Sequence, residues 1–403
     1  MEYYKLNDIL LEMHSGGTPS TEKKEYWNGT IKWLSSGETS QNFIYDTIDK
    51  ITEEGVKNSS TKLANKNDVV MACAGQGKTR GQVSYLLDDM YINQSVIALK
   101  ANPKKVNSLY LYYNLSSRYD ELRGGSDFSS TRGSITTATL KKLNIQLPPL
   151  PTQQKIAGIL SKYDEAIENN NKRIKLLEQM AQNLYKEWFV RFRFPGWQNA
   201  EFENGIPKGW KVEKLEDFCF ITDGTHDTPK QVEDGVPLVT GKAVIDRSID
   251  FSIPYNISFE DHEKIKRRSG LETGDILFSN IGTVGNCCLV DYDREFSVKN
   301  MIILKPQSEV KSQYLFHLLI NDTMQNLFKN QTNGSSQQFI GLDFMRKFKI
   351  LIPSEEVLKL FAKFEIKCTR LIVKLRQQTQ NLSRQRDLLL PRLMSGKLQV
   401  FRK

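Results

Sequence analysis

The sequence predicts an α+β protein in which two similar mixed α/β domains are separated by a long antiparallel two-helix coiled coil, with a pseudo-twofold repeat. Three observations support this fold class. Two stretches carry apolar residues alternately three and four positions apart over many turns, which is the spacing of a coiled-coil seam. The segments that precede these two stretches share one order of motifs. A linker rich in proline, glycine and polar residues separates the two halves.

The first long helix is predicted from Thr152 to about Arg191. The proline-rich segment 148–151 ends the preceding strand, and Thr152 is a suitable N-cap. At a rise of about 1.5 Å per residue, such a helix is longer than a compact domain requires, so it needs a partner helix. Its predicted seam residues are Ile156, Leu160, Tyr163, Ile167, Ile174, Leu177 and Leu184.

A second heptad pattern follows Pro353 and supplies that partner within the same chain. Two helices of similar length that each follow a globular segment can pair antiparallel. This arrangement places one domain near each end of the pair, which suits a ligand with two separated sites, such as duplex DNA with its repeat of about 34 Å. The predicted seam residues of this helix are Phe361, Phe364, Leu371, Leu375, Leu382 and Leu389.

The first domain is predicted to contain short strands and one helix rich in Leu and Tyr. Residues 210–352 repeat its order of motifs, with offsets between 204 and 210, which indicates an internal duplication. The predicted strands of the first domain cover residues 31–34, 68–72, 83–87, 94–100 and 143–147, and its helix covers 108–117. In the repeat, residues 5–8 recur as 214–217, residues 68–75 as 275–282, and Pro148 as Pro353.

These patterns divide the chain into five segments. Domain 1 is residues 1–150, the first coiled-coil helix is 151–194, the linker is 195–209, domain 2 is 210–352, and the second coiled-coil helix with its tail is 353–403. The formal charges are +2 for residues 1–150, +3 for 151–196, −4 for 197–352 and +8 for 353–403, so the basic excess lies on the helices. An acidic partner would be bound partly by the helices and partly by local loops of the domains, although solvated helix faces have the same composition.

Composition also narrows the class of protein. No apolar run approaches the roughly 18 residues of a membrane span, and the N-terminal residues do not form a signal peptide, so a cytoplasmic protein is expected. The five cysteines, at positions 73, 219, 287, 288 and 368, lack metal-ligand spacing. We therefore expect reduced thiols, no structural metal and no cofactor.

The strongest catalytic signal is the glycine-rich segment 72–79, which comes one residue short of a phosphate-binding P-loop. Ala72 stands where the first glycine is required, and residues 80–85 read as a turn into a strand instead of the helix that a P-loop opens. The equivalent segment 282–285 has no lysine. A tight turn with an exposed Lys78 is therefore favoured over a nucleotide site, and no catalytic triad or paired carboxylate stands out.

Polar loops offer a different chemistry. Arg and Lys pair with guanine edges, Asn and Gln with adenine, and Ser and Thr with bases or phosphates. Residues of these types cluster in equivalent loops of both halves, although any solvated loop has a similar composition. The candidate DNA-binding residues are Thr18, Ser20, Lys23, Lys78, Arg80, Gln82, Ser130, Arg132, Thr225, His226, Thr228, Lys230, Arg267, Ser335 and Gln337.

Several segments resemble the DNA-specificity subunits of type I restriction-modification systems, over essentially the whole chain. The most specific are the entry to the first helix, Leu147-Pro148-Pro149-Leu150-Pro151-Thr152-Gln153-Gln154-Lys155-Ile156, and the end of the second, Leu388 to Leu398. Gly274-Asp275-Ile276-Leu277 is typical of target-recognition domains. Residues 354–357 depart from the family pattern, since Ser-Glu-Glu-Val replaces the Pro-Thr-Gln-Gln entry.

The resemblance implies a non-catalytic subunit whose partners are double-stranded DNA, two methyltransferase subunits and motor-nuclease restriction subunits. Each target-recognition domain would read one half of a split sequence, and the coiled coil would set the gap and dock the methyltransferases. Adenine methylation and ATP-dependent cleavage would belong to the other subunits. Two alternatives stay open: a stand-alone bipartite DNA-binding regulator, and a phosphate-binding enzyme that uses Lys78.

Overall fold

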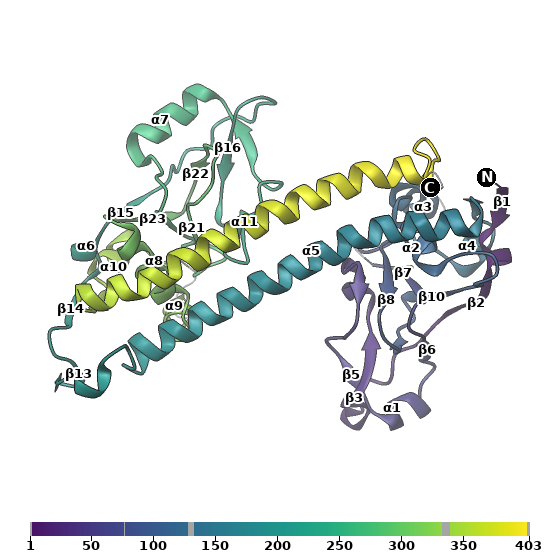
Figure 1. Cartoon of the computed structure of the whole chain (residues 1–403), viewed down its shortest axis with the longest axis horizontal. Coiled ribbons are helices and arrows are strands. Elements are labelled where there is room, and N and C mark those ends of the chain that lie inside the picture. The colour runs from purple at the N-terminus through teal and green to yellow at the C-terminus, as the bar shows by residue number, and fades with distance from the viewer. Residues whose placement is uncertain (1, 76, 128–132, 333–338, 401–403) are drawn as a thin grey trace. The chain divides into compact units, whose positions relative to one another are not determined.

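The computed structural model describes residues 2–75, 77–127, 133–332 and 339–400. The chain divides into two compact units (Figure 1). The first unit comprises residues 1–168 and 379–403, and the second comprises residues 169–378. Each unit therefore contains one globular domain together with one part of each long helix.

The first unit is built from two mixed sheets and short helices. One sheet has the order β2-β10-β7-β8-β4, a second has the order β5-β3-β9-β6, and β1 pairs with β11. Its strands are β1 (Glu2–Lys5), β2 (Leu10–Ser15), β3 (Trp27–Leu34), β4 (Phe43–Ile44), β5 (Lys50–Ile51), β6 (Lys62–Ala64), β7 (Val69–Ala72), β8 (Val83–Leu86), β9 (Met90–Ile92), β10 (Val96–Ala101) and β11 (Asn144–Leu147). Its short helices are α1 (Glu53–Lys57), α2 (Ser108–Ser116), α3 (Tyr119–Asp127) and α4 (Thr137–Lys141).

Helix α2 lies at the centre of this unit because it is apolar on every side, as a fully buried helix requires. Tyr110, Leu111 and Leu115 are completely buried, and Asn107 caps the helix by accepting a hydrogen bond from the Tyr110 amide at 2.9 Å. The same hydrophobic core includes Leu393 from the C-terminal end of the chain. The last turn of the second long helix is therefore part of the first unit's core.

The second unit repeats this plan with shorter strands. Its sheets have the orders β15-β23-β20-β21 and β19-β16-β22, and β14 pairs with β24 as β1 does with β11. Its strands are β12 (Phe202–Glu203), β13 (Ile206–Pro207), β14 (Lys211–Lys214), β15 (Cys219–Asp223), β16 (Val236–Val239), β17 (Val244–Ile245), β18 (Ser248–Ile249), β19 (Tyr255–Ile257), β20 (Ile276–Phe278), β21 (Cys287–Leu289), β22 (Ser297–Val298), β23 (Ile302–Pro306) and β24 (Lys349–Ile352). Its short helices are α6 (Leu215–Phe218), α7 (Phe259–Ser269), α8 (Glu309–Ile320), α9 (Asp322–Thr332) and α10 (Leu342–Lys347).

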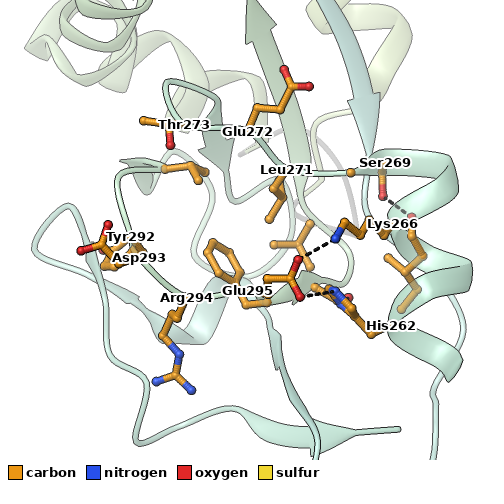
Figure 2. Close-up of a pocket in the computed structure, with 16 residues that line it drawn as sticks. His262, Lys266, Ser269, Leu271, Glu272, Thr273, Tyr292, Asp293, Arg294 and Glu295 are labelled. Carbon is orange, nitrogen blue, oxygen red and sulfur yellow. Dashed lines mark hydrogen bonds and ion pairs between the residues drawn. The ribbon is translucent and has the colours of Figure 1, made fainter. Parts of the chain in front are cut away.

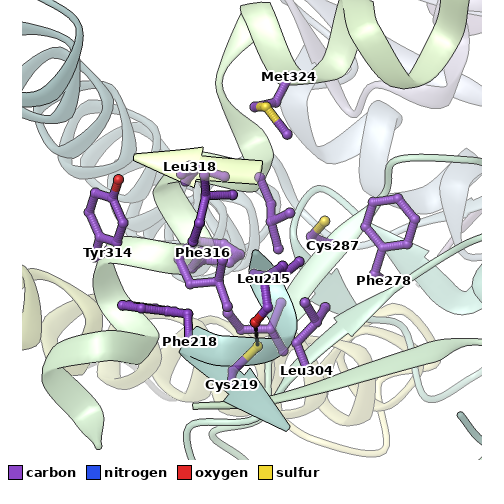
Figure 3. Close-up of a cluster of buried hydrophobic side chains, with 14 of the residues drawn as sticks. Leu215, Phe218, Cys219, Phe278, Cys287, Leu304, Tyr314, Phe316, Leu318 and Met324 are labelled. Atoms are coloured by element: carbon purple, nitrogen blue, oxygen red, sulfur yellow. Dashed lines mark hydrogen bonds between the residues drawn. The ribbon is translucent and has the colours of Figure 1, made fainter. Parts of the chain in front are cut away.

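The core of the second unit gathers around α8, the equivalent of α2. Figure 3 shows Tyr314 and Phe316 of α8 near Leu215 and Phe218. The latter two residues belong to α6, near the start of the domain. Phe189, at the end of the first long helix, meets the Tyr314 ring edge to face at a centroid distance of 4.9 Å. The predicted duplication is thus confirmed in sheet order and in the central helix.

The two long helices are α5 (Leu150–Tyr185) and α11 (Glu355–Met394), the longest ribbons in Figure 1. A π-helical turn, Lys186–Val190, extends α5. Helix α5 begins two residues before the predicted Thr152, because Pro151 in a first turn forfeits no intrahelical hydrogen bond. Within each unit the helices pair antiparallel: Asp164 contacts Arg386 in the first unit, and Glu178 contacts Arg376 in the second. The predicted fold class is confirmed.

Two predicted seam residues of α11 were wrong. Phe364 and Leu371 are 38% and 37% exposed, whereas Glu365 and Ile372, one position later, are buried. The heptad spacing of α11 therefore passes through Glu365 and Ile372, and the apolar neighbours project outward. The buried Glu365 has a partner on α8, since its Oε2 atom lies 2.9 Å from His317 Nε2. Buried seam residues of α11 are Phe361, Glu365, Cys368, Ile372, Leu375 and Leu393.

The other predicted seam residues are either buried or half-buried. Ile156 and Leu160 are 3% and 0% exposed, and both belong to the core of the first unit. Phe361 and Leu375 are likewise buried in the second unit. The half-buried members are Tyr163, Ile167, Ile174, Leu177, Leu184, Leu382 and Leu389.

A buried polar network joins the helix pair to the first domain. The Arg386 guanidinium donates to Asp164 Oδ1 at 2.5 Å, and the Tyr113 hydroxyl of α2 donates to Asp164 Oδ2 at 2.5 Å. Burial and the neighbouring carboxylate raise the pKa of the Tyr113 hydroxyl, so it stays a donor. In the second unit, His317 occupies the position on α8 that Tyr113 has on α2, and it meets Glu365 instead.

Candidate nucleic-acid interface

One edge of the central sheet of the first unit collects most of the predicted polar loops. Strand β2 ends at Ser15, which pairs with Ile97 near the start of β10, and Ala72 at the end of β7 pairs with Val96. Val83, at the start of β8, pairs with Met71. The loops 16–26, 73–82 and 93–95 therefore leave or enter the sheet at one edge, which we call the loop edge.

The loop edge brings together candidate residues that are far apart in the sequence. The Gly17 carbonyl accepts a hydrogen bond from the Trp33 indole at 3.2 Å, which fixes the loop that carries Thr18. The Arg80 guanidinium donates to the Gly133 carbonyl at 2.5 Å, and so joins two of the predicted loops. Candidates of the first unit at this edge are Thr18, Ser20, Lys23, Lys78, Arg80 and Gln82.

The second unit has an equivalent loop edge. Asp223, at the end of β15, pairs with Ile302 at the start of β23, and Phe278, at the end of β20, pairs with both Ile302 and Cys287. The loops after β15, after β20 and before β23 therefore meet at the same edge as their counterparts. Candidates carried by the loop after β15 are Thr225, His226, Thr228 and Lys230. Of these, Thr225 is buried, and the other three are exposed.

A side-chain cluster organises this second loop edge. The Asp223 carboxylate contacts His226 through one oxygen and accepts a hydrogen bond from Arg268 of α7 through the other, each at 2.7 Å. The Asp223 side chain is 13% exposed, whereas those of His226 and Arg268 are 61% and 53% exposed. His226 Nδ1 also lies 3.0 Å from the amide oxygen of Asn300. A buried acid thus holds two exposed basic side chains beside an amide.

Five predicted DNA-binding residues remain, and the structure describes one of them. Arg267 is an exposed neighbour of Arg268 at the end of α7. Sequence reasoning missed Gln94, Asn300 and Asp223, because only the strand pairing shows that they lie near the predicted loops. Four predicted residues lie outside the described part of the chain: Ser130, Arg132, Ser335 and Gln337.

The glycine-rich segment after β7 does not have the geometry of a phosphate-binding loop. Its backbone returns into strand β8, and the Gly81 amide donates to the Ala72 carbonyl at 2.9 Å, which closes a hairpin. A P-loop instead opens a helix whose amide groups face the phosphate. Lys78 therefore lies on an exposed hairpin at the loop edge, and this arrangement disfavours the nucleotide-binding alternative.

A separate cavity of about 230 Å³ lies between α7 and residues 290–298 (Figure 2). Lys266 donates to Glu295 at 2.5 Å, and the other oxygen of this carboxylate lies 3.6 Å from His262 Nε2. His262 Nδ1 is 2.9 Å from the Ser297 hydroxyl. These side chains contact one another where the helix meets the loop.

Three further findings concern the cysteines, possible metal ligands and the helices. All five cysteines are buried and free, and burial raises the pKa of the Cys219 thiol to about 12. Among the described residues, no group of three or more His, Cys, Asp and Glu side chains lies where it could hold a metal ion. In the same part of the chain, none of the helices combines the length and apolar character needed to cross a membrane.

Known proteins share both the sequence and the fold. The chain is 28% identical, over 98% of its length, to the type I restriction enzyme MjaIX specificity subunit of Methanocaldococcus jannaschii, and the match covers 93% of that protein. It is 22% identical, over 91% of its length, to the HindI specificity subunit of Haemophilus influenzae, with 94% of that protein covered.

Among solved structures, the S subunit of a type I restriction-modification system from M. genitalium superposes with a TM-score of 0.63. That match has 16% sequence identity and covers 97% of this chain and 95% of that chain, so it shows a shared fold. A family model described as the type I restriction modification DNA specificity domain matches residues 1–179 and again residues 207–381. The chain therefore belongs to the family of type I restriction-modification DNA specificity domains, with two copies of the domain in one polypeptide.

Proposed function

We propose that this specificity subunit reads a bipartite DNA sequence, with one half bound by each domain. The single observation that carries the proposal is the duplicated loop edge. In both units the same strand ends gather loops with basic, hydroxyl and amide side chains. Basic groups supply phosphate contacts, whereas amide and guanidinium groups distinguish base edges. Two such edges in one chain suit two half-sites.

The long helices support a second part of the proposal, which is docking of two methyltransferase subunits. In the second unit, α5 exposes Leu176 and Met180 at 58% and 52%, and α11 exposes Leu360, Phe364 and Leu371. Neighbouring apolar side chains on one helix face are typical of a protein interface. We assign this face to the methyltransferase subunits, and we assign cleavage to motor-nuclease restriction subunits that join the same complex.

The chain's own role is recognition. Specificity subunits are the non-catalytic members of these systems, and the loop edges described above offer hydrogen-bonding groups instead of a nucleophile with a base. Adenine methylation and ATP-dependent cleavage would then be supplied by the partners. We assign the gap between the half-sites to the helix pair, since each unit contains one part of both long helices.

The test is a domain exchange at the proposed boundary between residues 1–150 and the first coiled-coil helix. Residues 1–147 are replaced by the equivalent segment of another specificity subunit, and methylated sites are mapped in DNA from cells that also express the methyltransferase. We expect one half of the target to change while the other half and the gap persist. A change in both halves would refute the proposal that each domain recognises one half of the target by itself. Failure of the chain to bind methyltransferase would favour a stand-alone bipartite regulator.

A further inference from the structure

The two loop edges share a backbone crossing that positions one amide side chain in each unit. In the first unit, the loop after β2 crosses the loop before β10, and the Gly17 amide donates to the Ile92 carbonyl at 3.1 Å. In the second unit, the loop after β15 crosses the loop before β23, and the Thr225 amide donates to the Val298 carbonyl at 3.0 Å. The two crossings are therefore equivalent.

Each crossing is so close that it requires a glycine. A Cβ atom on Gly16 would lie 1.8 Å from the Ile92 carbonyl oxygen, and one on Gly224 would lie 2.3 Å from that of Val298. Both distances are far below any real contact, and the obstacle is backbone that cannot rotate away. The two loops are thus held in fixed contact at the same place in both domains.

At each crossing, a side chain of one loop contacts the side-chain amide group of a residue in the other loop. The Thr18 hydroxyl donates to the Gln94 amide oxygen, and His226 Nδ1 lies 3.0 Å from the Asn300 amide oxygen. Gln94 is exposed and Asn300 is half-buried. Within the described part of the chain, the amide NH₂ group and the second lone pair of the oxygen are in each case left for a ligand. A donor and an acceptor side by side match the N7 and N6 positions of adenine in the major groove.

The second unit adds a side-chain clamp to its loop edge. Asp223 fixes His226 and Arg268 through separate carboxylate oxygens, whereas the equivalent position in the first unit is Ser15. The carboxylate already holds the Arg268 side chain in one rotamer. Arg268 therefore loses less side-chain entropy than an unrestrained arginine when its remaining N–H groups bind a base or phosphate. Asp223 is thus a positioning residue, which acts through His226 and Arg268.

We propose that Gln94 and Asn300 are the base-reading amides of the two domains, each recognising an adenine in its own half-site, and that Asp223 positions the His226 and Arg268 side chains beside Asn300. This inference rests on the proposed bipartite DNA recognition and names the side chains that carry it. Its distinctive consequence is symmetry: one amide in each domain must control one base position in each half-site.

Asn300→Asp is the first variant to test, because Asn300 has a positive φ of 51° that Asp also tolerates and Ala does not. Aspartate keeps the acceptor and loses the donor, so the preference should move from adenine toward cytosine, whose N4 amino group is a donor. The complex of the full chain with its methyltransferase subunits is used to select from a pool of duplex DNA with randomised sequence. We expect discrimination at one position of one half-site to fall roughly 5- to 150-fold, the effect of losing one bidentate pair.

Gln94→Ala should relax one position in the other half-site by a similar factor. Gln307→Ala is the matched control, because Gln307 is an exposed amide that follows the opposite end of β23. It should leave both half-sites unchanged. Unchanged preferences in Asn300→Asp and Gln94→Ala, or effects of both on the same half-site, would overturn the inference. A wild-type complex that selects no two-part sequence would instead refute the proposed function.

The role of Asp223 is tested with Asp223→Ala and measured separately from stability. We expect the half-site that Asn300 controls to tolerate more sequences, while the half-site of Gln94 keeps its preference. The melting temperature of each variant is recorded beside the selection. A variant that loses stability but keeps the full preference in both half-sites would show that Asp223 is only structural.

Discussion

Replacement of Arg386 by methionine should destabilise the first unit by about 3–5 kcal/mol, which is the cost of removing one partner of a buried ion pair. Arg386 lies 2.5 Å from Asp164, and the two side chains are only 18% and 5% exposed. Without the guanidinium, the Asp164 carboxylate keeps the Tyr113 hydroxyl as a partner but no compensating charge. Methionine fills a similar volume, so the loss reports the charge and not a cavity.

A triple replacement separates the ion pair from the packing. Tyr113→Phe, Asp164→Leu and Arg386→Met together remove the buried polar members of the network, and the remaining partner of Arg386, Asp387, is exposed. Apolar replacements of buried ion pairs are often neutral or stabilising by about 1–4 kcal/mol. The triple variant should therefore recover most of the stability that the single variant loses. Arg384→Met, an exposed position on the same helix, is the control and should change stability by about 0.5 kcal/mol or less.

The assay is hydrogen exchange of the α2 amides in native conditions, because it reports the free energy of opening of the first unit separately from the second. Urea unfolding followed by circular dichroism gives the global value. A loss below about 1 kcal/mol in Arg386→Met would refute the reasoning, since it would show that Asp164 finds water or another partner at no cost. A triple variant as unstable as the single variant would refute it as well.

Three further predictions follow from burial and geometry. Gly224→Ala should separate the crossing loops of the second unit, because its Cβ would lie 2.3 Å from the Val298 carbonyl oxygen, and DNA selection should lose one half-site. Phe361→Ala, at a fully buried site, should cost about 3–5 kcal/mol in urea unfolding. Burial raises the pKa of both Tyr112 and Tyr185 above the ordinary value, so the folded state binds more protons than the unfolded state once the pH passes about 10. Stability should therefore fall as the pH rises above that value, and the absorbance change of these phenols should coincide with unfolding and not precede it.

The fold class was predictable because heptad spacing and the internal repeat are local properties of the sequence. The error in the α11 seam has a clear physical origin. Phe364 and Leu371 are apolar and sit at an allowed spacing, so the sequence predicts the seam through them, whereas Glu365 and Ile372 are the buried residues. The true seam includes a glutamate because His317, 48 residues away, pairs with it. No periodicity rule shows such a partner.

The candidate interface was predictable only in part. Loop composition identified Thr18 and His226, but their amide partners Gln94 and Asn300 lie in short loops between strands, where the sequence showed no polar cluster. Their proximity follows from the pairing of β2 with β10 and of β15 with β23. Gly16 and Gly224 precede the candidate loops of the two domains, and their need for close approach became evident only from the backbone crossing.

The most direct test of the bipartite account is to lengthen the helix pair and measure the gap in the recognised sequence. One heptad is inserted after Glu168 in α5 and one after Gln378 in α11, at the positions where both helices pass between the units. Seven residues add about 10.5 Å of helix, which corresponds to about three base pairs of duplex. Mapping of methylated sites should show both half-sites unchanged and the gap longer by about three base pairs. Insertion in α5 alone should disrupt the complex or alter the gap, and an unchanged gap in the doubly lengthened variant would contradict the account.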